Sequence, residues 1–190
     1  MSRKTLKIIA CILIGFILNG CVVKRLLEFK HQLKTPEKYI HFETKGVLVL
    51  KKPLLQLEDI ALLSGVYPSK IEENIAYYYF IRKEAPNYSF TYKLVFENKK
   101  LKIIDYPDIF YKRIKSSFAF DSLQLFGQSE MPDKGNWAVK NTGDTFLNAP
   151  TKKELINILG PPTSKSEFGN QDFINYNYEH PSINGNQTLS

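Results

Sequence analysis

The sequence predicts an α+β fold built from two related units behind an apolar leader, each unit a short helix followed by antiparallel strands. The main observation is a repeat, because residues 57–70 (LEDIALLSGVYPSK) are similar to residues 152–165 (KKELINILGPPTSK). In both copies a glycine and then a proline end the helical pattern, and a tyrosine-rich strand follows. A repeated sequence pattern indicates a repeated structural unit. About 170 residues follow the leader, which is enough for one domain or two small ones.

The leader ends at Cys21 and has the layout of an export signal. Basic residues precede an unbroken apolar run from Ile8 to Leu18, and Asn19, Gly20 and Cys21 follow it. This run is about half of the ~20 residues that a membrane-spanning helix needs, so it suits a secretion signal. The alternatives are an ordinary signal peptide and a buried N-terminal helix. A buried helix should show a polar face, which this run lacks.

The sequence Leu18-Asn19-Gly20-Cys21 resembles the lipobox of bacterial lipoproteins. This resemblance implies cleavage between Gly20 and Cys21, a diacylglyceride on the sulfur of Cys21 and an acyl chain on its amine. Val22 follows in place of an aspartate, which implies the periplasmic face of the outer membrane in a host with two membranes. Two or more acyl chains anchor stably, since each buried methylene contributes about 0.8 kcal/mol. Beyond these covalent lipid groups we expect no cofactor.

We expect five consecutive segments. They are a signal peptide (1–20), a lipidated tether (21–38), the first unit (39–105), a helical and turn-rich connector (106–149) and a second, partial unit (150–190). The tether is predicted because its weak helical period is broken at Thr35-Pro36.

The first unit opens with short runs at 39–43 and 46–50, which predict a hairpin or an edge strand. The helix that follows places Ile60 and Leu63 on one face and ends at Gly65, a C-cap in the left-handed conformation. A three-stranded meander comes next, over 76–80, 88–96 and 101–105.

The connector is predicted to contain a helix over 108–126, with Asp108 as its N-cap and Gly127 as its stop. Trp137, in the turn-rich part, is expected to fill a core rather than to bind a ligand.

In the second unit, Thr151 and Glu154 have the spacing of a capping box, so the helix is expected to begin at Thr151. A strand over 173–178 follows, and the end from His180 to Gly185 is expected to be frayed.

The helix that ends in Leu-Gly-x-Pro, the tyrosine-rich strand and the run LVFENKKLKII together resemble BamE, the SmpA/OmlA-type lipoprotein family of outer-membrane protein assembly. The tandem arrangement is similar to the architecture of β-lactamase inhibitory proteins. The resemblance covers 53–105 as a whole unit and 150–180 in part, and no contact residue of that family is carried over. It implies a role in outer-membrane assembly or maintenance.

The positive charge is concentrated at the start of the chain. Of the net charge of +7, the leader carries +3 and residues 24–52 carry +5, whereas residues 53–190 carry −1. This balance does not indicate a nucleic-acid partner, which would need a basic patch on the body. The basic segment contains Lys24, Arg25, Lys30, Lys34 and Lys38. These side chains are expected either to lie over anionic lipid head groups or to belong to a solvated tether.

Patterns of catalytic or metal-binding residues are absent from the sequence. His31, His41 and His180 lack metal-ligand spacing, and no nucleophile elbow, phosphate loop or dinucleotide fingerprint occurs. The acidic pairs Glu58-Asp59 and Glu72-Glu73 are interpreted as a solvated helix start and a turn. We therefore expect no enzyme activity, no catalytic residue and no metal.

The tyrosine cluster has two interpretations. An exposed strand face bearing tyrosines is typical of protein interfaces, and Tyr78 and Tyr92 are the candidate partner surface. Alternatively, the sheet is aromatic on both faces and is covered by residues 108–150.

These observations favour a membrane-anchored envelope lipoprotein that acts as a non-enzymatic protein-binding or scaffold module. Its expected partners are membrane lipid, through Cys21, and an envelope protein. The alternative is a periplasmic inhibitor of an enzyme such as a lysozyme, protease or β-lactamase. A hydrolase is disfavoured because no nucleophile–base pair is visible.

Overall fold

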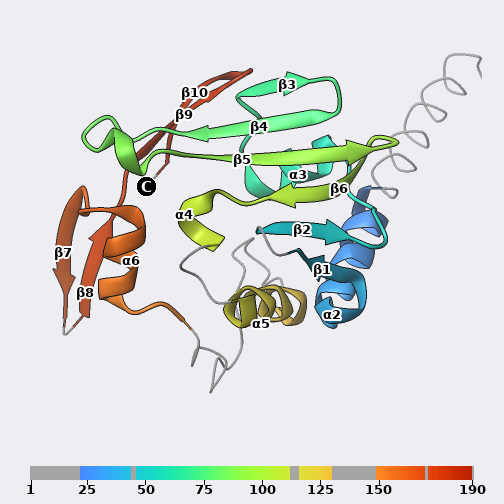
Figure 1. Cartoon of the computed structure of the whole chain (residues 1–190), viewed down its shortest axis with the longest axis horizontal. Coiled ribbons are helices and arrows are strands. Elements are labelled where there is room, and N and C mark those ends of the chain that lie inside the picture. Colours follow the sequence, from blue (N-terminus) through green and yellow to red (C-terminus); the bar gives the residue numbers. More distant parts are fainter. Residues whose placement is uncertain (1–21, 44–45, 112–115, 130–148, 170, 190) are drawn as a thin grey trace, which may run out of the picture.

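The computed structural model describes residues 22–43, 46–111, 116–129, 149–169 and 171–189. Within these residues the protein has an α+β fold, as predicted (Figure 1). Six strands form one antiparallel sheet in the order β1-β2-β6-β5-β4-β3, and two hairpins, β7–β8 and β9–β10, lie outside it.

The strands of the sheet are β1 (Ile40–Phe42), β2 (Val47–Leu50), β3 (Lys70–Glu72), β4 (Ile75–Phe80), β5 (Phe90–Glu97) and β6 (Lys100–Asp105). Helix α3 (Leu57–Ser64) separates the second strand from the third, and a 3₁₀ turn separates the fourth from the fifth. The predicted meander is confirmed as β4, β5 and β6. Asn98 and Lys99 form the turn between β5 and β6 with positive φ angles of 51° and 63°, which suits a tight hairpin.

The helices lie before, between and after these strands. They are the helix over 22–33, α2 (Pro36–Tyr39), α3 (Leu57–Ser64), the 3₁₀ turn η1 (Pro86–Tyr88), α4 (Asp108–Tyr111), α5 (Ser116–Gln128) and α6 (Lys152–Leu159). Gly65 ends α3 in the left-handed conformation, as predicted. The capping box at α6 is also confirmed, since the Glu154 amide donates to Thr151 Oγ1 and the Thr151 amide donates to Glu154 Oε2.

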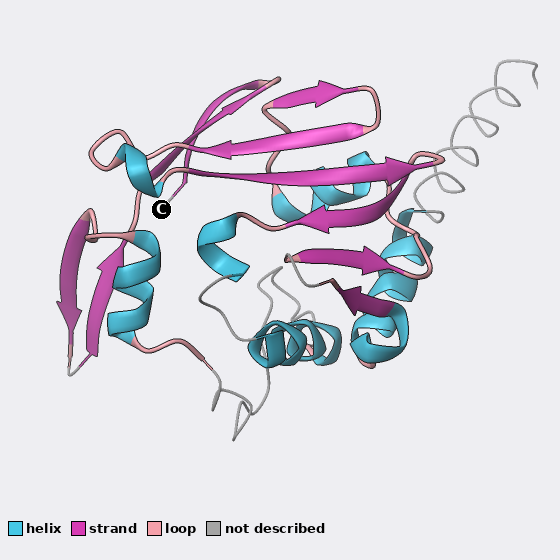
Figure 2. Cartoon of the chain, in the orientation of Figure 1, coloured by secondary structure: helices cyan, strands magenta, loops and turns pink. Residues whose placement is uncertain are grey.

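The core lies between one face of the sheet and the helices. Alternate residues of the central strands supply the sheet side, among them Leu48, Tyr78, Leu94 and Phe96. Residues of the helix over 22–33, of α3 and of α5 pack against them, including Leu26, Phe29, Ile60, Leu63, Phe120 and Leu123. Figure 2 shows these helices beside the sheet.

Residues 22–38 differ from the expected tether. They form the helix over 22–33 and α2, and Leu33 is only 1% exposed within the core. The weak apolar period that suggested a tether is the buried side of a docked helix. Its partner is the sheet, which forms from residues later in the chain.

The predicted helix over 108–126 is observed as α4 and α5, with 112–115 outside the described residues. Gly127 does not stop the helix but lies inside α5, so that prediction was wrong. A Cβ atom at Gly127 would lie 2.4 Å from the carbonyl carbon of Leu33. Glycine therefore permits the close approach of α5 to the chain at Leu33 and Lys34. Trp137 lies outside the described residues.

The C-terminal part contains β7 (Ser164–Phe168), β8 (Gln171–Asn175), β9 (Tyr178–Ser182) and β10 (Gly185–Leu189). The strand expected over 173–178 is divided between β8 and β9. The end that was expected to be frayed is the hairpin β9–β10, so that prediction was wrong too. Reciprocal hydrogen bonds of 2.9 and 2.8 Å between the main chains of Ile81 and Glu179 tie β9 to the end of β4.

The two ends of the sheet carry different parts of the chain. The helix over 22–33 and α2 lie at one end, and α6 with β7–β8 lies at the other (Figure 1). None of the helices in the described ranges has the length and apolar character to cross a membrane.

Candidate functional site

The helix over 22–33 has one face in the core and one face toward solvent. Leu26, Phe29 and Leu33 pack on the body. Val23 and Leu27, one turn apart, are 53% and 63% exposed. An exposed apolar face directly after the predicted lipid attachment residue is the first feature of the site.

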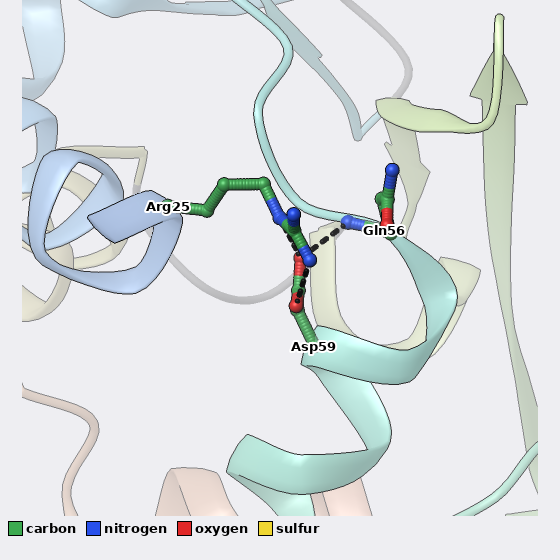
Figure 3. Close-up of polar contacts among 3 residues, drawn as sticks. All are labelled: Arg25, Gln56 and Asp59. Atoms are coloured by element: carbon green, nitrogen blue, oxygen red, sulfur yellow. Dashed lines mark hydrogen bonds and ion pairs between the residues drawn. The ribbon is translucent and has the colours of Figure 1, made fainter. Parts of the chain in front are cut away.

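A buried ion pair fixes this helix to the body (Figure 3). Arg25 donates from Nε to Asp59 Oδ2 and from Nη2 to Asp59 Oδ1, both at 2.8 Å. The Asp59 side chain is fully buried near the start of α3. There the main-chain N–H of Gln56 also donates to Asp59 Oδ2, at 2.9 Å. The interpretation of Glu58-Asp59 as a solvated helix start is therefore wrong for Asp59.

The ionisation of Asp59 follows from these contacts. Burial alone raises the pKa of the carboxyl group, because it removes water from the charged form. The hydrogen bonds from Arg25 and from the Gln56 amide, together with the charge of Arg25, outweigh burial and hold the pKa of Asp59 below its ordinary value. The pair is therefore charged at neutral pH.

The basic residues of this segment are divided between the fold and the surface. Arg25 is in the ion pair, and the Lys30 ammonium donates to the main-chain carbonyl of Ser129. Lys38 lies over the ring of Tyr39, 5.4 Å from its centroid. Lys24 and Lys34 are exposed. Two of the five candidates for lipid head groups are thus used inside the protein.

Two cavities flank the described part of this helix. The smaller, of about 180 Å³, is apolar and is formed by the helix, by Leu63 and by Phe126. The larger, of about 730 Å³, lies on the side of Val22. Its lining includes the charged or amide side chains of Arg25, Glu58, Glu73, Asn74 and Lys99.

Tyr78 and Tyr92, the predicted partner surface, point into the protein. Tyr78 is 6% exposed, and burial raises its pKa to about 12. Tyr92 is partly buried, with its ring centroid 5.9 Å from those of Phe80 and Phe110, and burial likewise raises its pKa. The prediction of an exposed pair is corrected, because even-numbered residues of β4 and β5 face the core.

The opposite face of the sheet carries an apolar row across four strands. Ile75 pairs with Val95, Val95 with Ile103, and Ile103 with Val49. All four side chains are half-buried, and none of them belongs to the core cluster. Tyr77 lies on the same face. Aromatic and aliphatic groups are therefore available on this face rather than at Tyr78 and Tyr92.

Arg82 and His180 join the C-terminal part to the sheet. Arg82 is 2% exposed and donates to the carbonyl oxygens of Leu159 (2.7 Å) and Pro161 (2.8 Å) at the end of α6. The ring nitrogens of His180, which is fully buried, lie 2.8 and 2.6 Å from the carbonyl oxygens of Tyr79 and Tyr67. Sequence reasoning missed both, because main-chain partners leave no residue-type signature.

Cys21, with Gly20 before it, lies outside the described residues, so lipidation and cleavage remain predictions. Among the residues that the structure describes, no group of three or more His, Cys, Asp or Glu could hold a metal ion. Comparison of the chain with protein-family models, with curated proteins and with solved structures finds no match.

Proposed function

We propose that the chain is a cell-envelope lipoprotein, anchored by acyl chains on Cys21, that acts as a non-enzymatic protein-binding module. The observation that carries the proposal is that the helix over 22–33 belongs to the folded body. Arg25–Asp59 and Leu33 hold it there. Acyl chains on Cys21 would therefore hold the body directly against the bilayer rather than at the end of a flexible tether.

The surface chemistry at this end supports membrane contact. Val23 and Leu27 are exposed and apolar, and Lys24 and Lys34 are exposed and basic. Apolar side chains at the head-group boundary and basic groups near anionic lipid both favour binding to a membrane surface. In a host with two membranes we place the anchor at the periplasmic face of the outer membrane, as Val22 after Cys21 implies.

The proposed binding role uses the half-buried row of the sheet. The row formed by Ile75, Val95, Ile103 and Val49 offers apolar area suited to a protein partner.

We also propose that the two units are related. In support, α3 and α6 each have eight residues, each is followed by glycine, and each precedes a hairpin.

Anchoring is tested by labelling cells with radioactive palmitate. The wild-type protein is expected to carry label and to sediment with membranes, because the acyl chains on Cys21 bind it to lipid. The Cys21→Ala protein is expected to lose both the label and the membrane association. Label that persists in Cys21→Ala, or a mature protein that starts at another residue, would contradict the proposal.

Partner binding is tested with a photoreactive phenylalanine analogue at Tyr77, on the half-buried face. After irradiation of cells we expect one discrete adduct with an envelope protein, detected on a denaturing gel. The matched control carries the analogue at Tyr67, which is 43% exposed and lies in the segment after α3. The absence of an adduct at Tyr77, or the same adduct from both positions, would refute this binding surface.

A further inference from the structure

The small apolar cavity beside the helix over 22–33 has the character of a lipid-binding pocket. Leu26, Phe29, Leu63 and Phe126 are half-buried and line it, and the exposed side chains of Val23 and Leu27 complete the lining. Lys30 also contributes to the lining, and its ammonium group donates to the Ser129 carbonyl.

Its size and lining favour an apolar occupant. A pocket holds ordered water only where two or more polar groups can hydrogen-bond to it, and covering apolar surface that water touches is favourable. This cavity measures about 180 Å³. The larger cavity at Val22 has a mixed lining, in which apolar residues such as Leu57, Ile75 and Phe96 alternate with charged and amide side chains. Of the two, the smaller has the almost wholly apolar lining that matches a hydrocarbon chain.

We propose that the pocket holds part of one acyl chain carried by Cys21, an inference that rests on the proposed lipid anchor. Val23 follows Cys21 by two residues. Two residues span at most about 7 Å even when fully extended, so an acyl chain on Cys21 starts within reach of the pocket. The remaining chains stay in the bilayer. The anchor then also orients the body, because the pocket must face the membrane.

The test uses the full lipidated protein in membranes. Cells are fed a palmitate analogue with a diazirine in its chain, the membranes are irradiated, and the crosslinked peptides are identified by mass spectrometry. We expect adducts on peptides that contain Leu26, Phe29, Leu63 or Phe126.

A matched pair of variants tests the pocket itself. Leu27→Glu places a charge in the pocket lining and is expected to reduce these adducts several-fold. Leu62→Glu is the control, because Leu62 is 67% exposed, close to the 63% of Leu27, and does not line the pocket. The control is expected to retain the wild-type adducts. An equal loss in both variants would indicate general contact with the membrane and overturn the pocket.

Three further outcomes separate the pocket from the anchor. A mature protein without acyl chains on Cys21 refutes the proposed function. An acylated protein whose chains crosslink only to phospholipid refutes the pocket and leaves the anchor intact. A photoreactive phospholipid that labels the pocket, while the chain on Cys21 does not, would assign the pocket to bilayer lipid and overturn the inference.

Discussion

Replacing Arg25 with methionine is expected to lower the free energy of unfolding by about 3 kcal/mol, the lower end of the range for breaking a buried ion pair. The substitution leaves the fully buried Asp59 carboxylate without its two hydrogen bonds of 2.8 Å to the guanidinium. The loss also removes the ion pair that joins the helix over 22–33 to α3. Denaturant unfolding of the purified protein, followed by circular dichroism, measures the change.

Two variants control this experiment. Lys24→Met changes an exposed neighbour of the same charge and is expected to leave stability within about 0.5 kcal/mol of wild type. The double substitution Arg25→Met and Asp59→Leu removes both charges and is expected to recover much of the loss, since apolar groups can replace a buried pair. If Arg25→Met and Lys24→Met cost the same, the pair does not hold the helix.

The pH dependence of the pair has a definite sign. Because the pKa of Asp59 is lowered in the folded protein, its contribution to stability is present above the unfolded-state pKa. This contribution is lost as the pH falls through the lower, folded-state pKa. Wild-type protein is therefore expected to lose more stability between neutral pH and acid than Arg25→Met does, measured by unfolding at the two pH values.

Replacing Arg82 with leucine is expected to detach the C-terminal part at a cost of about 3 kcal/mol, because hydrogen bonds to a charged donor contribute about 1.5–3 kcal/mol each. The carbonyl oxygens of Leu159 and Pro161 lose their donors at the end of α6. The guanidinium also lies over the rings of Tyr176 and Tyr178, at 5.3 and 5.9 Å. Arg82→Leu therefore removes both hydrogen bonds and both ring contacts of the guanidinium.

Hydrogen exchange gives the readout for Arg82→Leu. We expect faster exchange of the Glu179 amide, which bonds to Ile81, and unchanged exchange in β5 and β6. The control is Lys83→Leu, which removes an ion pair with Glu179 from a lysine side chain that is 71% exposed. Exposed pairs contribute at most about 1 kcal/mol. Slow exchange at Glu179 in Arg82→Leu would show that the C-terminal part is held by other contacts.

The sequence by itself determined the local structure. Gly65 and the pair Thr151–Glu154 mark helix ends because their preferences act within a few residues. The strands of the meander follow from runs of aromatic and β-branched residues, and the β5–β6 turn follows from Asn98-Lys99. The α+β class also follows from such local patterns, and the export leader before Cys21 stays a prediction from the same kind of pattern.

Only the tertiary structure decided which faces are covered. The period of a strand shows that Tyr77 and Tyr78 point opposite ways, but the helices that cover one face come from distant parts of the chain. Likewise, the helix over 22–33 is a docked element because Asp59 meets Arg25 across 34 residues. His180 can be buried because the main-chain carbonyl oxygens of Tyr79 and Tyr67 lie within hydrogen-bonding distance of its two ring nitrogens. Burial and pairing are properties of contacts between distant segments, and a local pattern does not specify them.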